Sequence, residues 1–353
     1  MSDSLKAMRR RPTQKEVAAR AGVSQAVVSE VLNGRVGAIR MQPETRARVL
    51  QAMRDLGYRP NAAARRLAGG QNRILGVFTY EPVFPTDTRD FYYPFLEGIE
   101  QAAAALDYDL LLHTRAPSAA GEAGRQRQLY EAGQTRLELA DGTLLLGDPD
   151  EGRRQELARL LGEGHPAVSI GRRELPDRAL PFVAADYAAA TEHALNALLA
   201  CGHRRVLYLG GLTHHESAVD REAGYRRGLE HQGVEPQVVR LDPGPLSLEQ
   251  VQEILAQGLT GLLIENDALA LRWTALAASL GQLAPRDYSF AVLGDPISGA
   301  SDPRRWAAFL IPRREMGAQA VRLLAQRLAG ERPEPISLPC AWRPGDSLGP
   351  APG

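Results

Sequence analysis

The sequence predicts a small all-helical N-terminal domain followed by a larger body of two doubly wound α/β lobes. In residues 1–70, apolar side chains recur at helical spacing, whereas short apolar runs alternate with helical segments in the rest of the chain. The charge divides at the same place. Residues 1–70 contain 14 Lys or Arg and 5 Asp or Glu, and the other 283 residues contain 28 and 37. A basic domain on an acidic body indicates a polyanion-binding module attached to a separate unit.

The composition is typical of a globular protein without membrane segments. Of its 353 residues 44% are hydrophobic, and no run of 18 apolar residues occurs. Residues 1–12 are polar and basic with no apolar segment behind them, so we expect a cytoplasmic protein without a signal peptide. Cys201 and Cys340 are too far apart for a disulfide framework or a metal motif. We therefore expect reduced, buried thiols, no metal and no cofactor.

The first helix is marked by Thr13 and Glu16, which have the spacing of a capping box. We expect it to end at Gly22, because a residue without Cβ suits a sharp turn, and Ser24 offers the N-cap of a second helix. Two short helices joined by a three-residue turn are typical of a helix-turn-helix.

The second helix divides into two faces when its residues are placed at about 100° intervals from Gln25. One face carries Val27, Val28, Val31 and Leu32 and is expected to be buried. The other carries small and polar residues, namely Gln25, Ala26, Ser29, Glu30 and Asn33. This face either reads base edges in a DNA groove or is an ordinary solvated helix face.

A third helix is predicted from Pro43, which suits the first helical position, to Gly57. Its apolar stripe consists of Val49, Ala52, Met53 and Leu56. The alanine-rich segment 60–68 that follows is a short helix former that would be marginal in isolation.

These motifs resemble the lactose-repressor (LacI/GalR) family. The residues that carry the resemblance are Val17–Ser24, Val28-Ser29, Val31–Gly34, Glu44–Arg46 and Leu56–Asn61. The resemblance implies a homodimer on a palindromic operator in double-stranded DNA. It also implies base contacts from Gln25, Ala26 and Glu30, and phosphate contacts from Thr13, Ser24, Ser29 and Asn33.

In that family, the segment matching 60–70 forms a hinge helix that inserts into the minor groove. The resemblance assigns Asn61, Ala64, Arg65 and Leu67 to this role, with Leu67 as the wedge between base steps. A plain linker is the alternative. The sequence departs from the family at Glu30, where arginine is usual, and in the 34–43 loop, which is about three residues longer. We therefore expect an operator different from the family's usual one.

In the body, apolar runs predict strands at Ile74–Tyr80, Asp109–His113, Thr143–Leu146 and Ala167–Ile170, and then at Val206–Leu209, Val238–Leu241, Gly261–Ile264 and Phe290–Leu293. Helices are expected at Phe95–Leu106, Gln126–Ala132 and Gln155–Leu161, and then at Ala188–Cys201, Ala223–Gln232, Leu248–Ala256 and Ala268–Leu280. Strands that alternate with helices predict parallel sheets covered on both faces. The resemblance extends over this body and implies a periplasmic-binding-protein-like fold.

The expected divisions are a helix-turn-helix domain at 1–59, a hinge helix at 60–70 and an effector-binding body at 71–353. Within the body we expect a first lobe at about 71–183 and 310–335. The second lobe is expected at about 184–309 and 336–345.

Ligands of open parallel sheets bind beyond the carboxyl ends of the strands, which here face each other across two lobes. Residues matching Arg221, Asn266 and Asp295 contact the effector in sugar-binding members of the family. Asp186 and Asp267 are better explained as helix caps. The segment 81–95 departs from the family and is rich in aromatic residues, so Tyr92 and Tyr93 either stack on a ligand or fill the core.

Two other classes of protein share this body: an α/β enzyme and a small-molecule receptor without a DNA role. We expect no catalytic residues, because the sequence contains no nucleophile elbow, phosphate-binding loop or metal-spaced His and Cys. His214 and His215 are adjacent in a loop and unsuited to sharing a metal. The sequence therefore favours a transcription regulator. The resemblance implies a repressor whose affinity for its operator is controlled by a small, sugar-like effector.

Overall fold

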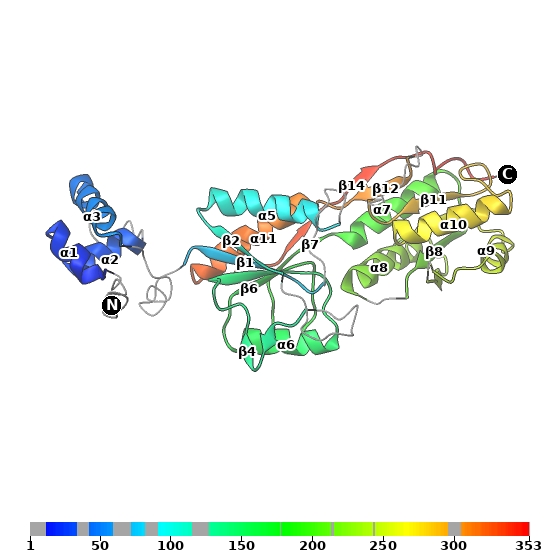
Figure 1. Cartoon of the computed structure of the whole chain (residues 1–353). Helices are drawn as coiled ribbons and strands as arrows, with labels where there is room; N and C mark the ends of the chain where they lie inside the picture. Colours follow the sequence, from blue (N-terminus) through cyan, green and yellow to red (C-terminus); the bar gives the residue numbers. More distant parts are fainter. Residues whose placement is uncertain are drawn as a thin grey trace, which may run out of the picture. The chain divides into compact units, whose positions relative to one another are not determined.

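A computed structural model describes residues 12–33, 42–58, 72–81, 91–114, 127–176, 178–212, 215–242, 244–295 and 305–352 (Figure 1). The chain divides into two compact units, with the boundary between Arg73 and Ile74. We call the first unit the head and the second the body.

The head contains three helices: α1 (Gln14–Ala21), α2 (Gln25–Asn33) and α3 (Pro43–Leu56). The predicted capping box is confirmed, since Thr13 Oγ1 accepts from the Glu16 N–H at 3.3 Å and Glu16 Oε2 accepts from the Thr13 N–H at 2.7 Å. Gly22 and Gly57 end their helices at φ +67° and +62°, as predicted from their missing Cβ atoms. The predicted apolar faces form one small core, whose fully enclosed members are Val17, Ala18, Ala21, Val28, Val49 and Ala52.

The first lobe of the body is a parallel sheet in the order β13-β7-β6-β5-β1-β2. Its strands are β1 (Ile74–Thr79), β2 (Asp109–His113), β5 (Gly142–Leu146), β6 (Ala167–Ile170), β7 (Phe182–Ala185) and β13 (Ile336–Leu338). Helices α5 (Tyr93–Ala105) and α11 (Arg313–Leu328) pack together on one face, and α6 (Glu151–Gly162) covers the other (Figure 1).

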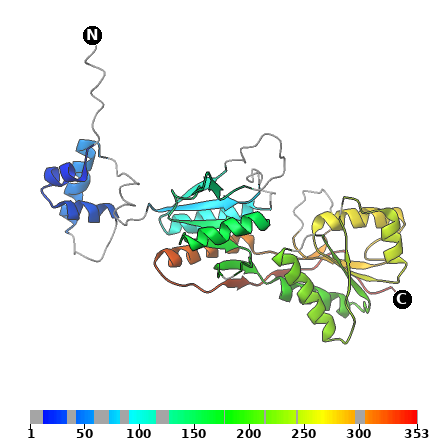
Figure 2. The same ribbon diagram turned by 90° about the horizontal axis from the view of Figure 1, so that it is seen from below.

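The second lobe has the sheet order β14-β12-β11-β10-β8-β9, in which only the edge strand β14 is antiparallel. Its strands are β8 (Val206–Gly210), β9 (Gln237–Arg240), β10 (Gly261–Ile264), β11 (Ser289–Val292), β12 (Ala307–Leu310) and β14 (Ala341–Arg343). Helices α7 (Tyr187–Ala200) and α8 (Glu216–Glu230) lie on one side of this sheet, and α9 (Leu248–Leu255) and α10 (Asp267–Ser279) on the other (Figure 2). The two lobes confirm the predicted doubly wound fold.

The helix predicted at Gln126–Ala132 is wrong. In the described part of this segment, residues 127–129 are irregular and Tyr130–Ala132 belong to a hairpin of β3 (Tyr130–Glu131) and β4 (Gln134–Thr135). Its two loop residues, Ala132 and Gly133, have φ of +48° and +82°, which matches the two-residue turns that join antiparallel strands. The turn therefore overrides the apolar spacing that favoured a helix.

The chain crosses between the lobes three times: from β7 to α7, from β12 to α11, and from β13 to β14. The third crossing lies a few residues beyond the expected boundary at 335, because Ile336–Leu338 pair with β7 of the first lobe. Each lobe is thus assembled from separate stretches of chain.

Glycines allow the helices of the first lobe to touch. A Cβ added to Gly98 of α5 would lie 1.9 Å from the carbonyl oxygen of Arg314 on α11, and one added to Gly317 would lie 2.2 Å from that of Phe95. Both distances are far below van der Waals contact, so the two helices pack backbone against backbone. Within the described ranges, the helices lack the length and continuous apolar surface of a membrane span.

Candidate functional site

The outward face of α2 is available for contacts at its N-terminal end. Gln25 and Ala26 are exposed, and Ser29 and Glu30 are half-buried. The hydroxyls of Thr13 and Ser24 accept backbone N–H groups at the starts of α1 and α2, at 3.3 and 3.4 Å. The Asn33 side chain and the hinge residues Asn61, Ala64, Arg65 and Leu67 lie outside the described part of the chain.

A cavity of about 260 Å³ lies between the two lobes of the body. The first lobe contributes residues that follow β1, β5 and β6, namely Glu81, Asp148 and Arg172-Arg173. The second lobe contributes the start of α8, with His215, Ser217 and Asp220. The cavity therefore lies beyond the carboxyl ends of the first-lobe strands, where ligands of open parallel sheets bind.

Aromatic side chains form one side of the cavity. Phe91 and Tyr92 contact each other edge to face, with ring centroids 5.2 Å apart, and Phe95 and Tyr187 also line it. Gly147 leaves room for this wall, because a Cβ there would lie 3.3 Å from the Tyr92 hydroxyl. Tyr93, the other predicted stacking residue, is 37% exposed and is not part of this lining.

Arg221 contacts residues that line the cavity but is not itself part of the lining. Its guanidinium lies 4.0 Å from the ring centroid of Tyr187, and its Nε donates to the Leu293 carbonyl at 2.7 Å. Its Nη1 donates to the Ser217 carbonyl at 2.9 Å. Arg221 thus holds two residues that line the cavity without lining it itself.

The other predicted effector residues also bond to protein groups. Asn266 caps α10 by accepting from the Leu269 N–H at 2.9 Å. Asp295 accepts from the Ile311 N–H at 2.8 Å and from Arg313 Nη1 at 2.5 Å. Of the five predicted effector contacts, Tyr92 alone is among the described residues that line the cavity.

The remaining sequence expectations concern caps and thiols. Asp186 caps α7 through the Ala189 N–H, whereas the cap of α10 is Asn266 and Asp267 is the first helical residue. Cys201 and Cys340 are free and half-buried, not fully buried as expected. Burial raises the pKa of the Cys340 thiol to about 12, so it is a poor nucleophile near neutral pH.

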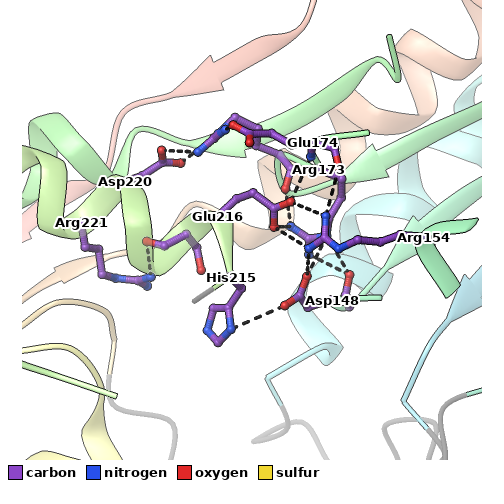
Figure 3. Close-up of polar contacts among 11 residues, drawn as sticks. Asp148, Arg154, Arg173, Glu174, His215, Glu216, Asp220 and Arg221 are labelled. Carbon is purple, nitrogen blue, oxygen red and sulfur yellow. Dashed lines mark hydrogen bonds and ion pairs between the residues drawn. The ribbon is translucent and has the colours of Figure 1, made fainter. Parts of the chain in front are cut away.

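Charged side chains bridge the lobes at the edge of the cavity (Figure 3). Arg172 contacts Asp220 twice, at 2.7 and 3.3 Å, and Arg154 Nη1 lies 2.7 Å from Glu216 Oε1. His215 Nδ1 lies 3.5 Å from Asp148 Oδ2. This network was not predicted from the sequence, although Glu216 and Asp220 at helical i, i+4 spacing and two arginines after a strand were visible signals.

Glu216 is the most buried carboxylate of the network, with 6% of its surface exposed. Burial alone would raise its pKa, but this is outweighed by the Arg154 hydrogen bonds, by backbone N–H groups of Glu174 and Glu216, and by the charge of Arg173. Together these lower the pKa of the Glu216 carboxyl to about 2. Glu216 is therefore ionised throughout the physiological range.

The low pKa of Glu216 predicts that the stability of the folded body decreases at acidic pH. A carboxyl whose pKa falls from 4.5 to about 2 on folding stabilises the folded body above pH 4.5, and this contribution is lost as the pH falls toward 2. At about 1.4 kcal/mol per pKa unit, the full contribution is about 3 kcal/mol. The difference in unfolding free energy between the wild type and Glu216→Gln should therefore shrink between pH 6 and pH 3. A difference that stays constant over that range would contradict the assignment.

Comparison with known proteins follows the same division of the chain. Residues 13–61 match the family of bacterial regulatory proteins, lacI family. Residues 82–261 match the periplasmic binding proteins and sugar binding domain of the LacI family, and residues 195–348 match a periplasmic binding protein-like domain. These matches confirm the predicted fold class.

Two relatives cover nearly the whole chain. An HTH-type transcriptional regulator in the aml 5' region of Streptomyces limosus is 32% identical, with 90% of this chain and 88% of that protein aligned. The HTH-type transcriptional regulator CelR of Thermobifida fusca is 28% identical over 94% of this chain and 96% of its own length.

Solved structures show the same fold. A complex of the regulator CelR with cellobiose has a TM-score of 0.61 at 24% identity, covering 96% of this chain and all of that one. A lac repressor dimer bound to operator and the anti-inducer ONPF has a TM-score of 0.64 at 22% identity, with the same coverage. The family matches over both units, together with the 32% identical relative, show that the chain belongs to the LacI family of bacterial transcriptional regulators.

Proposed function

We propose that this DNA-binding regulator is a homodimeric repressor that works in the cytoplasm and releases a palindromic operator when a neutral saccharide binds between the lobes of its body. The observation that carries the proposal is the cavity, which combines an aromatic wall with charged groups that can bind hydroxyls. In this proposal, residues 1–59 read DNA, residues 60–70 form the hinge and residues 71–353 form the sensor.

The cavity suits a small polyhydroxylated ligand. Its 260 Å³ is close to the lower end of the range for small-molecule sites, about 300–1,000 Å³. The apolar faces of sugar rings pack on aromatic side chains such as Tyr92, and carboxylates such as Asp148 accept hydrogen bonds from hydroxyls. A relative in this family, CelR, has been solved with cellobiose. We assign the body to ligand binding without turnover.

The effector assignment predicts a difference between two neighbouring tyrosines. Thermal unfolding in the presence of cellobiose, maltose, melibiose or sucrose should identify a saccharide that stabilises the protein, by about 2.7 kcal/mol at 100 times its dissociation constant. Tyr92→Ala should remove this stabilisation, because it deletes part of the aromatic wall. Tyr93→Ala should retain it, because Tyr93 is exposed and does not line the cavity. If no saccharide stabilises the wild type, the effector class is wrong.

For the head, we propose that Gln25, Ala26 and Glu30 contact bases and that Thr13, Ser24, Ser29 and Asn33 contact phosphates. The exposure of Gln25 and Ala26 supports this orientation. A dimer is proposed because one helix-turn-helix reads only a few base pairs, and a two-fold pair reads both halves of a palindrome.

Gln25→Ala should weaken binding to the cognate operator by about 1–3 kcal/mol and relax the preference at one base position. Titrations of operator variants at fixed ionic strength measure both effects. Gln51→Ala is the matched control, since Gln51 is an exposed glutamine on α3 whose bonds to described residues are with Arg54 and Asp55 of its own helix. A uniform loss of affinity for every base variant would assign Gln25 to the backbone and not to a base.

A further inference from the structure

The Glu216 carboxylate of the second lobe contacts three residues of the first lobe, Arg154, Arg173 and Glu174 (Figure 3). Its Oε1 accepts from Arg154 Nη1 at 2.7 Å and from the Glu174 N–H at 2.9 Å. Its Oε2 accepts from Arg154 Nη2 at 3.3 Å and lies 3.7 Å from Arg173 Nη1. These partners come from two different parts of the first lobe, helix α6 and the loop after β6.

Arg154 and Arg173 also contact Asp148, a residue that lines the cavity. Arg154 Nη2 lies 3.2 Å and Arg173 Nε 3.6 Å from Asp148 Oδ1. Arg173 is further held by the Gly147 carbonyl, at 2.7 Å from its Nη2. Glu216 itself does not appear in the lining of the cavity, so it acts on Asp148 and Arg173 from outside.

One turn further along α8, Asp220 makes a second connection across the lobes through Arg172. At this interface the first lobe has three arginines, Arg154, Arg172 and Arg173, and two carboxylates of its own, Asp148 and Glu174. The second lobe has the carboxylates of Glu216 and Asp220, with His215 beside them. The first lobe thus presents guanidinium groups directly to the carboxylates of the second. Such complementary surfaces attract each other, and removal of one buried partner leaves the other charges unpaired.

We propose that Glu216 is a positioning residue that holds the two lobes together across the cavity before any ligand enters. It pairs with Arg154 and Arg173, and through them fixes Asp148 at the edge of the binding site. The lobes are therefore closed by charge in the ligand-free protein, and a ligand enters a preformed site. This goes beyond the proposed effector and does not depend on its identity.

The test measures the distance between the lobes in the full-length, ligand-free protein by double electron–electron resonance spectroscopy. Spin labels are attached to cysteines introduced at Gln155 on α6 and Glu230 on α8, both exposed. Cys201 and Cys340 are replaced by serine, and labelled chains are diluted with unlabelled protein so that the measured pairs lie within one chain. The variants compared are Glu216→Gln, the charge-retaining Glu216→Asp, and Glu192→Gln.

Glu192 is a matched control, because its ion pair with Arg227 at 2.9 Å joins α7 and α8 within the second lobe. We expect one short distance in the parent protein and in Glu192→Gln. Glu216→Gln should shift the ratio of closed to open molecules at least about tenfold toward open, which corresponds to about 1.4 kcal/mol. Glu216→Asp should give an intermediate ratio.

Salt provides an independent measurement. In about 1 M sodium chloride, where the Debye length is about 3 Å, the more exposed pair of Arg172 and Asp220 should be screened, so the parent protein should shift toward open. The buried pairs of Glu216 are screened much less, so Glu216→Gln should still shift the ratio further. Asp220→Asn, at the more exposed connection, should shift the ratio in the same direction and is less disruptive to folding. An unchanged distance in both Glu216→Gln and Asp220→Asn would overturn the proposal, as would an equal shift in Glu192→Gln. The saccharide assay is separate, so its failure leaves this result unaffected.

Discussion

Val49→Asp should abolish operator binding while the body remains folded. Val49 lies on α3 with none of its surface exposed, in a core whose fully enclosed members are six side chains. Domains of this size are marginally stable, and an unpaired carboxylate in such a core costs several kcal/mol. We therefore expect the head to unfold and operator affinity to fall by more than about 100-fold, equivalent to about 2.7 kcal/mol.

Fluorescence anisotropy with a labelled operator duplex measures the loss. The neighbouring Leu50 is 37% exposed, so Leu50→Asp adds the same charge without burying it and should bind within a few-fold of the wild type. All three tryptophans, Trp273, Trp306 and Trp342, lie in the body, so their fluorescence reports whether the body is intact. Retained operator binding by Val49→Asp would contradict the three-helix core described here.

Gly98→Ala should strongly destabilise the body, since among the described helical glycines its added Cβ would have the shortest contact. The new Cβ would lie 1.9 Å from the Arg314 carbonyl oxygen, which is backbone and cannot rotate away. The α5 and α11 helices would have to separate, and overpacking of this kind costs about 1–3 kcal/mol or more. Thermal unfolding followed by far-ultraviolet circular dichroism should show a midpoint lower by several degrees.

Gly152→Ala is the matched control. Gly152 also lies in a helix, α6, but an added Cβ would meet only Asp150 Oδ1 at 3.4 Å. Because alanine is a better helix former than glycine, this variant should be unchanged or more stable by up to about 1 kcal/mol. Equal effects of the two substitutions would show that helix propensity, and not the contact between α5 and α11, determines the result.

The parts of the fold that the sequence predicts well depend on local interactions. The capping box of Thr13 and Glu16 involves residues three apart, and the buried face of α2 follows from helical spacing alone. Buried strands such as β5 and β10 are visible as continuous apolar runs. In contrast, β13 and β14 are only three residues long and pair with strands that are distant in the sequence, so no local sequence pattern predicts them.

The cavity is predicted only in part, because its geometry depends on residues far apart in the chain. Arg154 and Glu216 are 62 residues apart, and Arg172 and Asp220 are 48 apart. Strand ends correctly indicate the crevice, and Tyr92 lines it as predicted from its aromatic segment. The side-chain pairs across the crevice depend on how the two lobes approach each other, which sequence spacing does not describe.

The three crossings between the lobes have a consequence for synthesis on the ribosome. The three-helix reader is complete by residue 58, whereas the first lobe needs α11 and the edge strand β13, which ends at Leu338. Because translation proceeds from the N-terminus, the DNA reader emerges and folds long before its receptor is complete. A nonsense mutation anywhere between these points would therefore produce a truncated protein that carries the reader without a ligand-responsive receptor.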